Sequence, residues 1–280
     1  MTLLSPAKIN LSLRILGKRP DGFHEIETRL VRLAFGDTVE IEHLGFGTSV
    51  NFTCSDPTVP SDESNLALKA LRAFESRVGT QSSWRIHLEK RIPHGAGLGG
   101  GSSNAATILR AANELSGSPL ALPQLLELAA QIGSDVPCFL LDSPAADGTG
   151  RGEIVQPADF PHQLHLVLIK PPFPIPTPWA YKNWADSREV PGVLYAPQLC
   201  EWGTMVNDLE RPVFQKYLLL PALKNWLREH AATRAALMSG SGSTMFAITD
   251  TAAQAAELAE KARAWCGETS WTLATQTGKA

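Results

Sequence analysis

Residues 93–106 read PHGAGLGGGSSNAA, and this glycine-rich stretch constrains fold and function more than any other segment. Five of the seven residues from 95 to 101 are glycine, which costs backbone entropy but lets main-chain N–H groups crowd around an anion. Ser102 and Ser103 then open an alanine-rich stretch that predicts a helix. Because the N-terminus of a helix favours negative charge, the segment predicts a phosphate-binding loop rather than a mobile surface loop.

Several common phosphate-binding motifs do not fit this loop. The pattern Gly95-x-Gly97-x-x-Gly100 formally matches the dinucleotide fingerprint of Rossmann oxidoreductases. However, the preceding stretch WRIHLEKRI alternates apolar and polar residues, whereas a parallel Rossmann strand is buried on both faces. A second helix is expected where a βαβ unit needs a strand, and no acidic residue ends a second strand about 20 residues on. No lysine follows Gly101, as Walker A requires, and the protein-kinase motifs H-R-D and D-F-G are absent from the sequence.

The residues around the loop predict mixed strands and helices. Alternating apolar residues indicate half-buried strands, and apolar residues at helical spacing indicate amphipathic helices. Pro20-Asp21-Gly22 is a turn signal between the first two strands. The elements expected in the first half are strands at 9–16, 26–33, 39–42, 50–53 and 84–92, helices starting near 66, 103 and 123, and a loop at 145–152.

The second half begins with a proline tract. The stretch PPFPIPTP at 171–178 holds five prolines in eight residues, which predicts a stiff extended connection. The elements expected around it are strands at 165–170, 244–248 and 269–275, and helices within 203–230 and at 251–265. Together these patterns predict an α+β protein, divided near the proline tract into domains 1–160 and 161–280.

Composition excludes several classes of protein. The 280 residues are 44% hydrophobic and 19% charged with a formal net charge of −3, which argues against disorder and against a nucleic-acid coat protein. No apolar run approaches the roughly 20 residues of a membrane span. Four scattered cysteines form no C-x-x-C pair, and the N-terminus lacks a signal-peptide pattern. We therefore expect a cytoplasmic protein that binds neither nucleic acid nor membrane.

Three segments together resemble the three motifs of the GHMP small-molecule kinases. They are SPAKINL at 5–11, the glycine-rich stretch at 93–106 and MSGSGSTMF at 238–246. The boxes PDGFHE at 20–25 and GSDVP at 133–137 resemble one branch of that family, the kinases of 4-diphosphocytidyl-2-C-methyl-D-erythritol in the non-mevalonate isoprenoid pathway. The resemblance implies the GHMP fold, with an N-terminal domain like the second domain of ribosomal protein S5 and a ferredoxin-like C-terminal domain.

The resemblance also implies a reaction and its catalytic residues. The γ-phosphoryl group of ATP would pass to the 2-hydroxyl of the cytidine-diphosphate-linked sugar alcohol, with Asp135 as general base. Lys8 would orient Asp135, hold it ionised and stabilise the developing charge. From the residues alone, Asp135 is also a helix N-cap candidate before Pro137, and the two roles are compatible. A lone Lys8 would favour a surface lysine with an apolar stem.

The binding residues are likewise carried over from the family motifs. Those implied for ATP are Asn65, Pro93, Gly95, Ala96, Gly97, Leu98, Gly99, Gly100, Gly101, Ser102 and Ser103. Those implied for the cytidyl substrate are Asn10, Phe23, His24, Thr177, Tyr181, Gly240 and Ser241. Without the family context, Asn65 is an N-cap candidate, and Phe23 and Tyr181 are as readily core residues as stacking residues. Phe23 stands where the family more usually has Tyr, so a ring remains for stacking but a hydroxyl is missing.

The expected co-substrate is ATP, entering with Mg²⁺ because a divalent cation neutralises the polyphosphate. No dedicated metal site is expected from the sequence, and Ser103 is a metal-ligand candidate by analogy only.

We expect a monomer or a weak homodimer. The alternatives are a GHMP kinase of another alcohol, such as homoserine or mevalonate, and a GHMP-fold binding module without catalysis. Retention of both Lys8 and Asp135 argues against the second alternative.

Overall fold

Two very long strands organise the chain. In the computed structural model, which describes residues 1–278, the whole of β1 (Thr2–Lys18) pairs antiparallel with residues 24–40 of β2 (His24–Phe46). Their register shifts at three places, one of them between Asn10 and Ser12. Such bulges bend a strand and re-aim its side chains. The separate short strand expected at 39–42 is part of β2, because apolar residues continue to alternate through this region.

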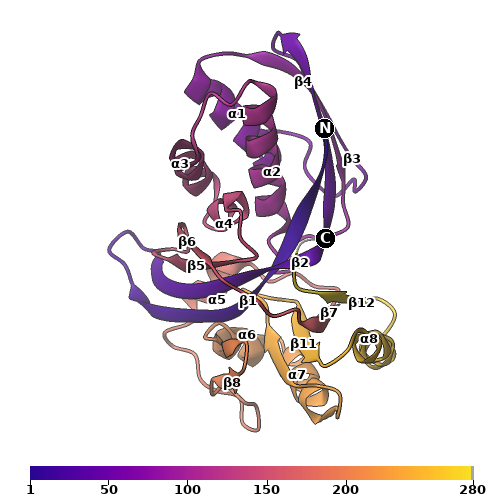
Figure 1. Cartoon of the computed structure of the whole chain (residues 1–280). Helices are drawn as coiled ribbons and strands as arrows, with labels where there is room; N and C mark the ends of the chain where they lie inside the picture. The colour runs from indigo at the N-terminus through magenta and orange to yellow at the C-terminus, as the bar shows by residue number, and fades with distance from the viewer. Residues whose placement is uncertain (279–280) are drawn as a thin grey trace.

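The other strands of the first sheet flank this pair (Figure 1). The order β3-β4-β2-β1-β9-β8 is extended by β5, which pairs with β2, and by β6, which pairs with β5. These strands are β3 (Val50–Cys54), β4 (Ser82–Glu89), β5 (Ala145–Thr149), β6 (Ile154–Ala158), β8 (Gln198–Cys200) and β9 (Gly203–Asn207). Antiparallel pairing dominates, so the parallel sheet of a Rossmann fold is excluded.

Four helices cover one face of this sheet, as Figure 1 shows. They are α1 (Leu66–Val78), α2 (Gly100–Leu115), α3 (Leu122–Ile132) and the short α4 (Val136–Leu140). In β4 the alternation predicted from the sequence is confirmed: Trp84, Ile86 and Leu88 are buried, while Arg85 and Glu89 are exposed. The buried side chains pack against α1 and α2 in one apolar core.

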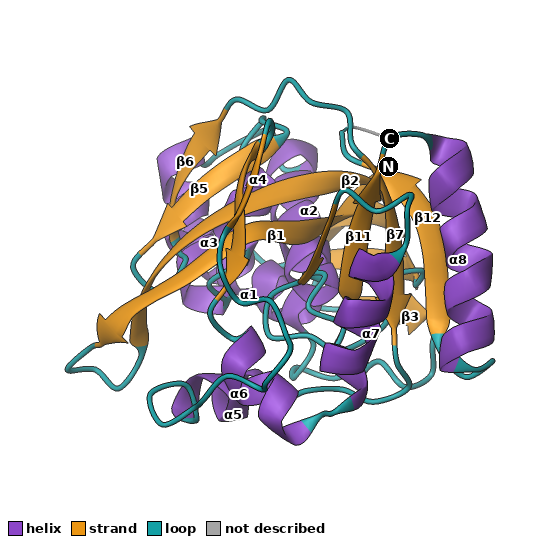
Figure 2. Cartoon of the chain, turned by 90° about the horizontal axis from the view of Figure 1, so that it is seen from below, coloured by secondary structure: helices purple, strands orange, loops and turns teal. Residues whose placement is uncertain are grey.

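A second, four-stranded antiparallel sheet has the order β10-β11-β7-β12. Its strands are β7 (His165–Lys170), β10 (Ala235–Met238), β11 (Met245–Thr249) and β12 (Trp271–Gln276). The helices of this half are α5 (Thr177–Lys182), α6 (Glu210–Lys216), α7 (Leu219–Glu229) and α8 (Ala252–Cys266). Figure 2 shows α8 beside β12, with α7 also on this sheet. A further core lies between the two sheets, where Ile9 and Leu11 meet Leu168 and Phe246.

The α+β class predicted from the sequence is confirmed, but four local expectations are wrong. Residues 145–149 are a strand rather than a loop, because Gly148 fits closely beside Thr28 of β2. Residues 203–207 form β9 instead of helix. The proline tract is extended only to Pro176, since Pro178 is tolerated in the first turn of α5. Strand β10 was not expected, because four residues carry too little periodicity.

Candidate active site

A lysine–aspartate pair lies where β1 meets the start of α4. The Nζ of Lys8 is 3.3 Å from Oδ2 of Asp135. The Lys8 side chain is 4% exposed, whereas that of Asp135 is 37% exposed. Asp135 immediately precedes α4, yet its side chain makes no capping hydrogen bond. Its carboxylate is therefore held by Lys8 rather than by the helix, with one side open to solvent.

Neighbouring polar groups fix the position of the Lys8 ammonium. Its Nζ donates to Oδ1 of Asn10 at 2.7 Å and to the carbonyl oxygen of Gly97 at 3.1 Å. The amide nitrogen of Asn10 in turn donates to Oγ1 of Thr28 at 2.8 Å, which donates to the carbonyl of Ser12. Lys8 and Asn10 share one face of β1, because side chains two residues apart point the same way. This chain of hydrogen bonds orients the ammonium toward the carboxylate and the glycine-rich loop.

The loop takes a path that only glycine follows easily. Gly97 and Gly99 have φ of 74° and 72°, in the left-handed region that disfavours other residues. A Cβ on Gly97 would lie 2.2 Å from the carbonyl oxygen of Ser239, and one on Gly99 would lie 3.0 Å from atoms of Lys8 and Phe139. Gly99 is the N-cap of α2 and offers no side-chain cap, so the helix begins without a side-chain acceptor for its first N–H groups.

The remaining predicted loop residues surround this path. Pro93 opens the loop, and Gly95 approaches Pro174 from the second half of the chain. Leu98 is buried and its carbonyl accepts from the backbone N–H of Lys8 at 3.0 Å. Gly100, Gly101 and Ser102 form the first turn of α2. The first turn of a helix is a favourable position for phosphate oxygens.

A turn from the second half completes the cluster. Residues 239–244 connect β10 to β11, and the Oγ of Ser239 donates to the carbonyl of Gly97 at 3.0 Å. The backbone N–H of Thr244 donates to the carbonyl of Ala96 at 3.2 Å. A Cβ on Gly240 would lie 3.3–3.4 Å from Asn10, Gly97 and Lys8. The structure thus brings together all three motifs that carried the resemblance.

Buried hydrogen bonds connect the first turn of α2, which follows the loop, to β1 and β2. Ser103 is fully buried, and its hydroxyl accepts from Oγ of Ser5 at 2.8 Å. Asn104 donates to Ser5 and to the buried carboxylate of Asp37, both at 2.9 Å. Asp37 also pairs with Lys90 and accepts from the backbone of Arg91 and Ile92 just before the loop. Ser103 therefore lies within a structural network, which gives no support to its analogy-based assignment as a metal ligand.

Asn65 is the N-cap of α1. Its Oδ1 accepts from the backbone N–H of Ala67 at 2.9 Å, and its Nδ2 donates to the carbonyl of Pro60 at 2.7 Å. Both ends of the amide are thus used to start the helix and to fix the loop that precedes it. The capping alternative from the sequence is confirmed, whereas a contact of Asn65 with a nucleotide stays a prediction.

The aromatic residues expected at the substrate end separate into two places. The His24 ring lies 5.5 Å from the ring of Tyr181 and 6.0 Å from that of Trp184. Phe23 is 52% exposed on the β1–β2 connection, and the guanidinium of Arg151 lies 4.8 Å from its ring centre. His24 and Tyr181 therefore form one cluster, and Phe23 stands at its outer side with Arg151.

The titration behaviour of this cluster reflects its burial. Burial, helped by the positive charge of Lys18, lowers the pKa of His24, so the imidazole is neutral at pH 7 and offers one donor and one acceptor. Burial and then the charge of Asp135 raise the pKa of the Tyr181 hydroxyl. The influence of Asp135 on Tyr181 links the aromatic cluster to the lysine–aspartate pair.

The last two predicted residues lie between these groups. The hydroxyls of Thr177, at the start of α5, and Ser241, in the 239–244 turn, are 2.8 Å apart.

Within residues 1–278, no group of three or more His, Cys, Asp or Glu side chains is arranged to hold a metal ion. None of the helices in the same range is long and apolar enough to cross a membrane.

Three side chains at the site were not predicted from the sequence. Asn207 is buried and donates to the carbonyls of Met238 and Gly240, both at 2.7 Å, so it holds the 239–244 turn in place. An asparagine before a helical stretch is an N-cap signal, which was available in Asn207-Asp208-Leu209. Thr28 and Trp184 carry no local signal, since only the folded chain brings them to Asn10 and His24.

Comparison with known proteins identifies relatives of the chain. The family model for the N-terminal domain of GHMP kinases matches residues 65–143, and that for the C-terminal domain matches 196–268. The chain is 49% identical over 245 residues to the 4-diphosphocytidyl-2-C-methyl-D-erythritol kinase of Methylacidiphilum infernorum (isolate V4), covering 87% of this chain and 84% of the relative.

Solved structures agree with these relatives. A crystal structure of 4-(cytidine 5'-diphospho)-2C-methyl-D-erythritol kinase superposes with a TM-score of 0.80 and 34% identity, covering 99% of this chain and all of the other. A homoserine kinase from Cytophaga hutchinsonii ATCC 33406 has a TM-score of 0.66 over 98% of this chain and 95% of its own, but 16% identity, so it shares the fold alone. The resemblance found in the motifs is confirmed: the chain is a kinase that belongs to the 4-diphosphocytidyl-2-C-methyl-D-erythritol kinase family of the GHMP kinases.

Proposed function

We propose that the chain transfers the γ-phosphoryl group of ATP to the 2-hydroxyl of 4-diphosphocytidyl-2-C-methyl-D-erythritol in the non-mevalonate isoprenoid pathway. The observation that carries this proposal is the Lys8–Asp135 pair, whose ammonium also contacts the carbonyl of Gly97 in the glycine-rich loop. A candidate base and a candidate phosphate site thus lie side by side, as phosphoryl transfer to an alcohol requires.

In this mechanism Asp135 is the general base. Its partly exposed carboxylate takes the proton of the substrate hydroxyl, whose oxygen attacks the γ-phosphorus as the bond to the β–γ bridging oxygen breaks and ADP leaves. Lys8 keeps the carboxylate in position and stabilises negative charge on the transferred group. Asn10 and Thr28 support Lys8 through the hydrogen bonds described above.

The glycine-rich loop and the first turn of α2 would hold the phosphates of ATP. The absence of side chains at Gly95, Gly97 and Gly99–Gly101 leaves backbone N–H groups accessible, and the helix N-terminus favours the negative charge. Mg²⁺ would enter bound to ATP and neutralise part of the polyphosphate charge.

The aromatic cluster would hold the cytosine base. His24, as a neutral imidazole, offers both a donor and an acceptor to a base edge, and Tyr181 offers a ring face for stacking. Phe23, with Arg151 over its ring, would close the outer side of the pocket. The Thr177 and Ser241 hydroxyls, which are 2.8 Å apart, and the Gly240 backbone would contact the sugar alcohol and its diphosphate.

The proposed reaction is tested by measuring ADP release from MgATP with the cytidyl substrate, beside homoserine and mevalonate at equal concentration. We expect turnover with the cytidyl substrate alone. Turnover with homoserine or mevalonate would favour another GHMP kinase activity. No turnover with any substrate, in chain that still binds ATP, would favour a binding module without catalysis.

We further propose that the enzyme is cytoplasmic and is a monomer or a weak homodimer. The composition and the free thiols of Cys54, Cys138, Cys200 and Cys266 support a reducing compartment. Sedimentation velocity over a range of concentrations tests the assembly: a single species of about 30 kDa, or a shift toward twice that mass at high concentration, agrees with the proposal. A stable larger oligomer would contradict it.

A further inference from the structure

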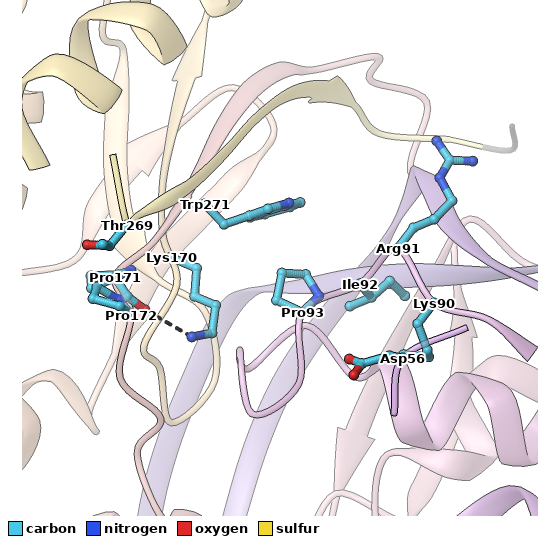
Figure 3. Close-up of a pocket in the computed structure, with 10 residues that line it drawn as sticks. All are labelled: Asp56, Lys90, Arg91, Ile92, Pro93, Lys170, Pro171, Pro172, Thr269 and Trp271. Atoms are coloured by element: carbon cyan, nitrogen blue, oxygen red, sulfur yellow. Dashed lines mark hydrogen bonds between the residues drawn. The ribbon is translucent and has the colours of Figure 1, made fainter. Parts of the chain in front are cut away.

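A cavity of about 270 Å³ lies between the two halves of the chain (Figure 3), and neither Lys8 nor Asp135 lines it. One wall is the segment Lys90–Pro93, which leads from β4 into the glycine-rich loop. The other wall is formed by Lys170–Pro172, at the end of β7, and by Trp271, at the start of β12. The cavity therefore borders the outer end of the loop and contains none of the proposed catalytic side chains.

Lys170 is unusual among the charged residues of this cavity. It is 9% exposed, and its Nζ donates to the carbonyl oxygen of Pro171 at 2.9 Å. Within residues 1–278, no carboxylate lies within ion-pair distance of it. An ammonium carries three N–H donors, so two of them have no acceptor among the described residues. Burial alone lowers the pKa of Lys170, as expected for a charge removed from water without a counter-ion.

The other charged groups of the cavity already have partners. The Lys90 ammonium pairs with the buried carboxylate of Asp37. The Arg91 guanidinium lies 5.3 Å from the ring centre of Phe35. The Asp56 carboxylate accepts from the backbone N–H and the hydroxyl of Thr58, at 2.9 and 2.7 Å. Among the cations that line the cavity, Lys170 is thus the one with neither an ion pair nor a ring contact in the described residues, while Arg91 has a ring contact but no carboxylate.

The apolar part of the lining is rigid. The rings of Pro93, Pro171 and Pro172 each fix the φ torsion of their residue, and Figure 3 shows the Trp271 ring extending across the space between the two walls. A preformed space of this kind requires little ordering when a ligand binds. Its volume lies just below the range of about 300–1,000 Å³ that is usual for ligand pockets, which favours a small ligand.

We propose that this cavity binds a small phosphorylated metabolite, whose phosphate or diphosphate group pairs with Lys170 while its apolar part contacts Trp271. A phosphate group fits better than a carboxylate, because its additional charge and oxygens match the two unused donors of Lys170 with Arg91 near by. The site contains neither Lys8 nor Asp135, although it shares Pro93 with the residues implied for ATP. The same chemistry is present in the polyphosphate of ATP, so a test must separate the two sources.

Inorganic diphosphate is the probe for this site, measured by isothermal titration calorimetry on the full chain. The titration is made with the glycine-rich loop saturated by a non-hydrolysable ATP analogue and Mg²⁺. We expect saturable binding of one diphosphate per chain. Lys170→Met should weaken it about 10-fold or more, Lys170→Arg should retain it, and Lys69→Met, at an exposed lysine on α1, should leave it unchanged.

A second measurement does not depend on the Lys170 variants. Diphosphate should change the tryptophan fluorescence of the wild-type chain, and Trp271→Phe should remove most of that change while the binding heat remains. Loss of diphosphate binding when the ATP analogue is present would show that the anion occupies the nucleotide site and would overturn the proposal. The same holds for equal affinity in wild type and Lys170→Met, or for no saturable heat at millimolar diphosphate.

Discussion

The environment of a single carboxylate distinguishes the interpretations of the GSDVP box. Asp135 stands at the N-cap position of α4, where a capping role is the usual expectation. Its Oδ2 faces Lys8 instead, and Lys8 is almost completely buried. A buried ammonium requires a partner, so the pair stabilises Lys8 as well as orienting Asp135. Position in a helix alone is therefore a poor guide to the role of this side chain.

Replacing the carboxylate tests its proposed role directly. Asp135→Asn keeps the shape of the side chain but removes its ability to accept a proton, so we expect kcat to fall about 10²-fold or more. Affinity for ATP should change little, as measured by calorimetry with a non-hydrolysable analogue. Asp159→Asn, at an exposed aspartate, is the matched control. An Asp135→Asn enzyme within threefold of wild type would exclude Asp135 as the base.

The proposed base pocket predicts a different kinetic effect. Tyr181→Ala removes the ring beside His24, and we expect KM for the cytidyl substrate to rise about 10-fold, because stacking of a base is worth about 1–3 kcal/mol. Tyr181→Phe keeps the ring and should retain a nearly normal KM. Steady-state kinetics at saturating ATP give both values. An unchanged KM in Tyr181→Ala would assign the ring to the apolar core.

At the residue scale, the sequence predicts a site residue where the residue type and its spacing from neighbouring residues indicate the same function. The glycine-rich stretch predicts a phosphate loop from its composition, and a loop leading into a helix is observed. The Lys8–Asp135 contact could not be derived from local patterns, because 126 residues separate the two in the chain. Only the family resemblance paired them. Asn207 has a local signal for capping. Its hydrogen bonds to the 239–244 turn and to the end of β10, however, depend on strands that meet only in the folded chain.

At the scale of elements, the regular patterns were predicted well and the short ones were not. Strand β4 alternates strictly, and α8 has periodic apolar residues behind a Thr–Gln capping box, so both carry a strong local signal. Strands β5, β9 and β10 have four or five residues each, too few to show a period. Their conformation is imposed by pairing with β2, β1 and β11.

The importance of the close contact between the glycine-rich loop and the 239–244 turn can be tested by adding a single methyl group at Gly97. Gly97→Ala places a Cβ 2.2 Å from the Ser239 carbonyl, so the two segments must separate. We expect the free energy of unfolding to fall by about 1–3 kcal/mol from this overpacking, and KM for ATP to rise. Gly117→Ala is the control, because its φ is also left-handed at 82° but nothing lies within 4 Å of the added Cβ.

This control separates backbone strain from steric clash. Both variants bear the cost of a left-handed alanine, about 1–2 kcal/mol, and only Gly97→Ala adds the clash. Urea unfolding of the two variants measures the difference. Equal losses of stability, with normal KM for ATP in both, would show that close contact at Gly97 is unimportant.

At the scale of the whole molecule, the two halves are joined by more than the proline tract. Strand β9 comes from the second half yet pairs parallel with β1 of the first sheet, at Ser12 and Leu13. Leu13 and Ile15 pack in the same apolar core as α6 and α7. The division into domains 1–160 and 161–280 stays a prediction, since the second half supplies strands to the first sheet.

These shared strands predict that the chain unfolds as one cooperative unit. Trp84 lies in the core of the first half, and the other six tryptophans follow residue 160, so Trp84→Phe makes fluorescence a probe of the second half alone. We expect its urea midpoint to coincide with that from far-ultraviolet circular dichroism of the same variant. Two separated transitions would instead support domains that unfold independently.

The arrangement around Lys8 has a consequence for synthesis of the chain on the ribosome. Lys8 and the carbonyl of Gly97 emerge early, but the turn that completes their surroundings, through Ser239 and Gly240, lies in the last fifth of the sequence. Strand β10, and Asn207 that fixes the turn to it, also come late. A nascent chain therefore carries an incomplete site until translation is nearly finished.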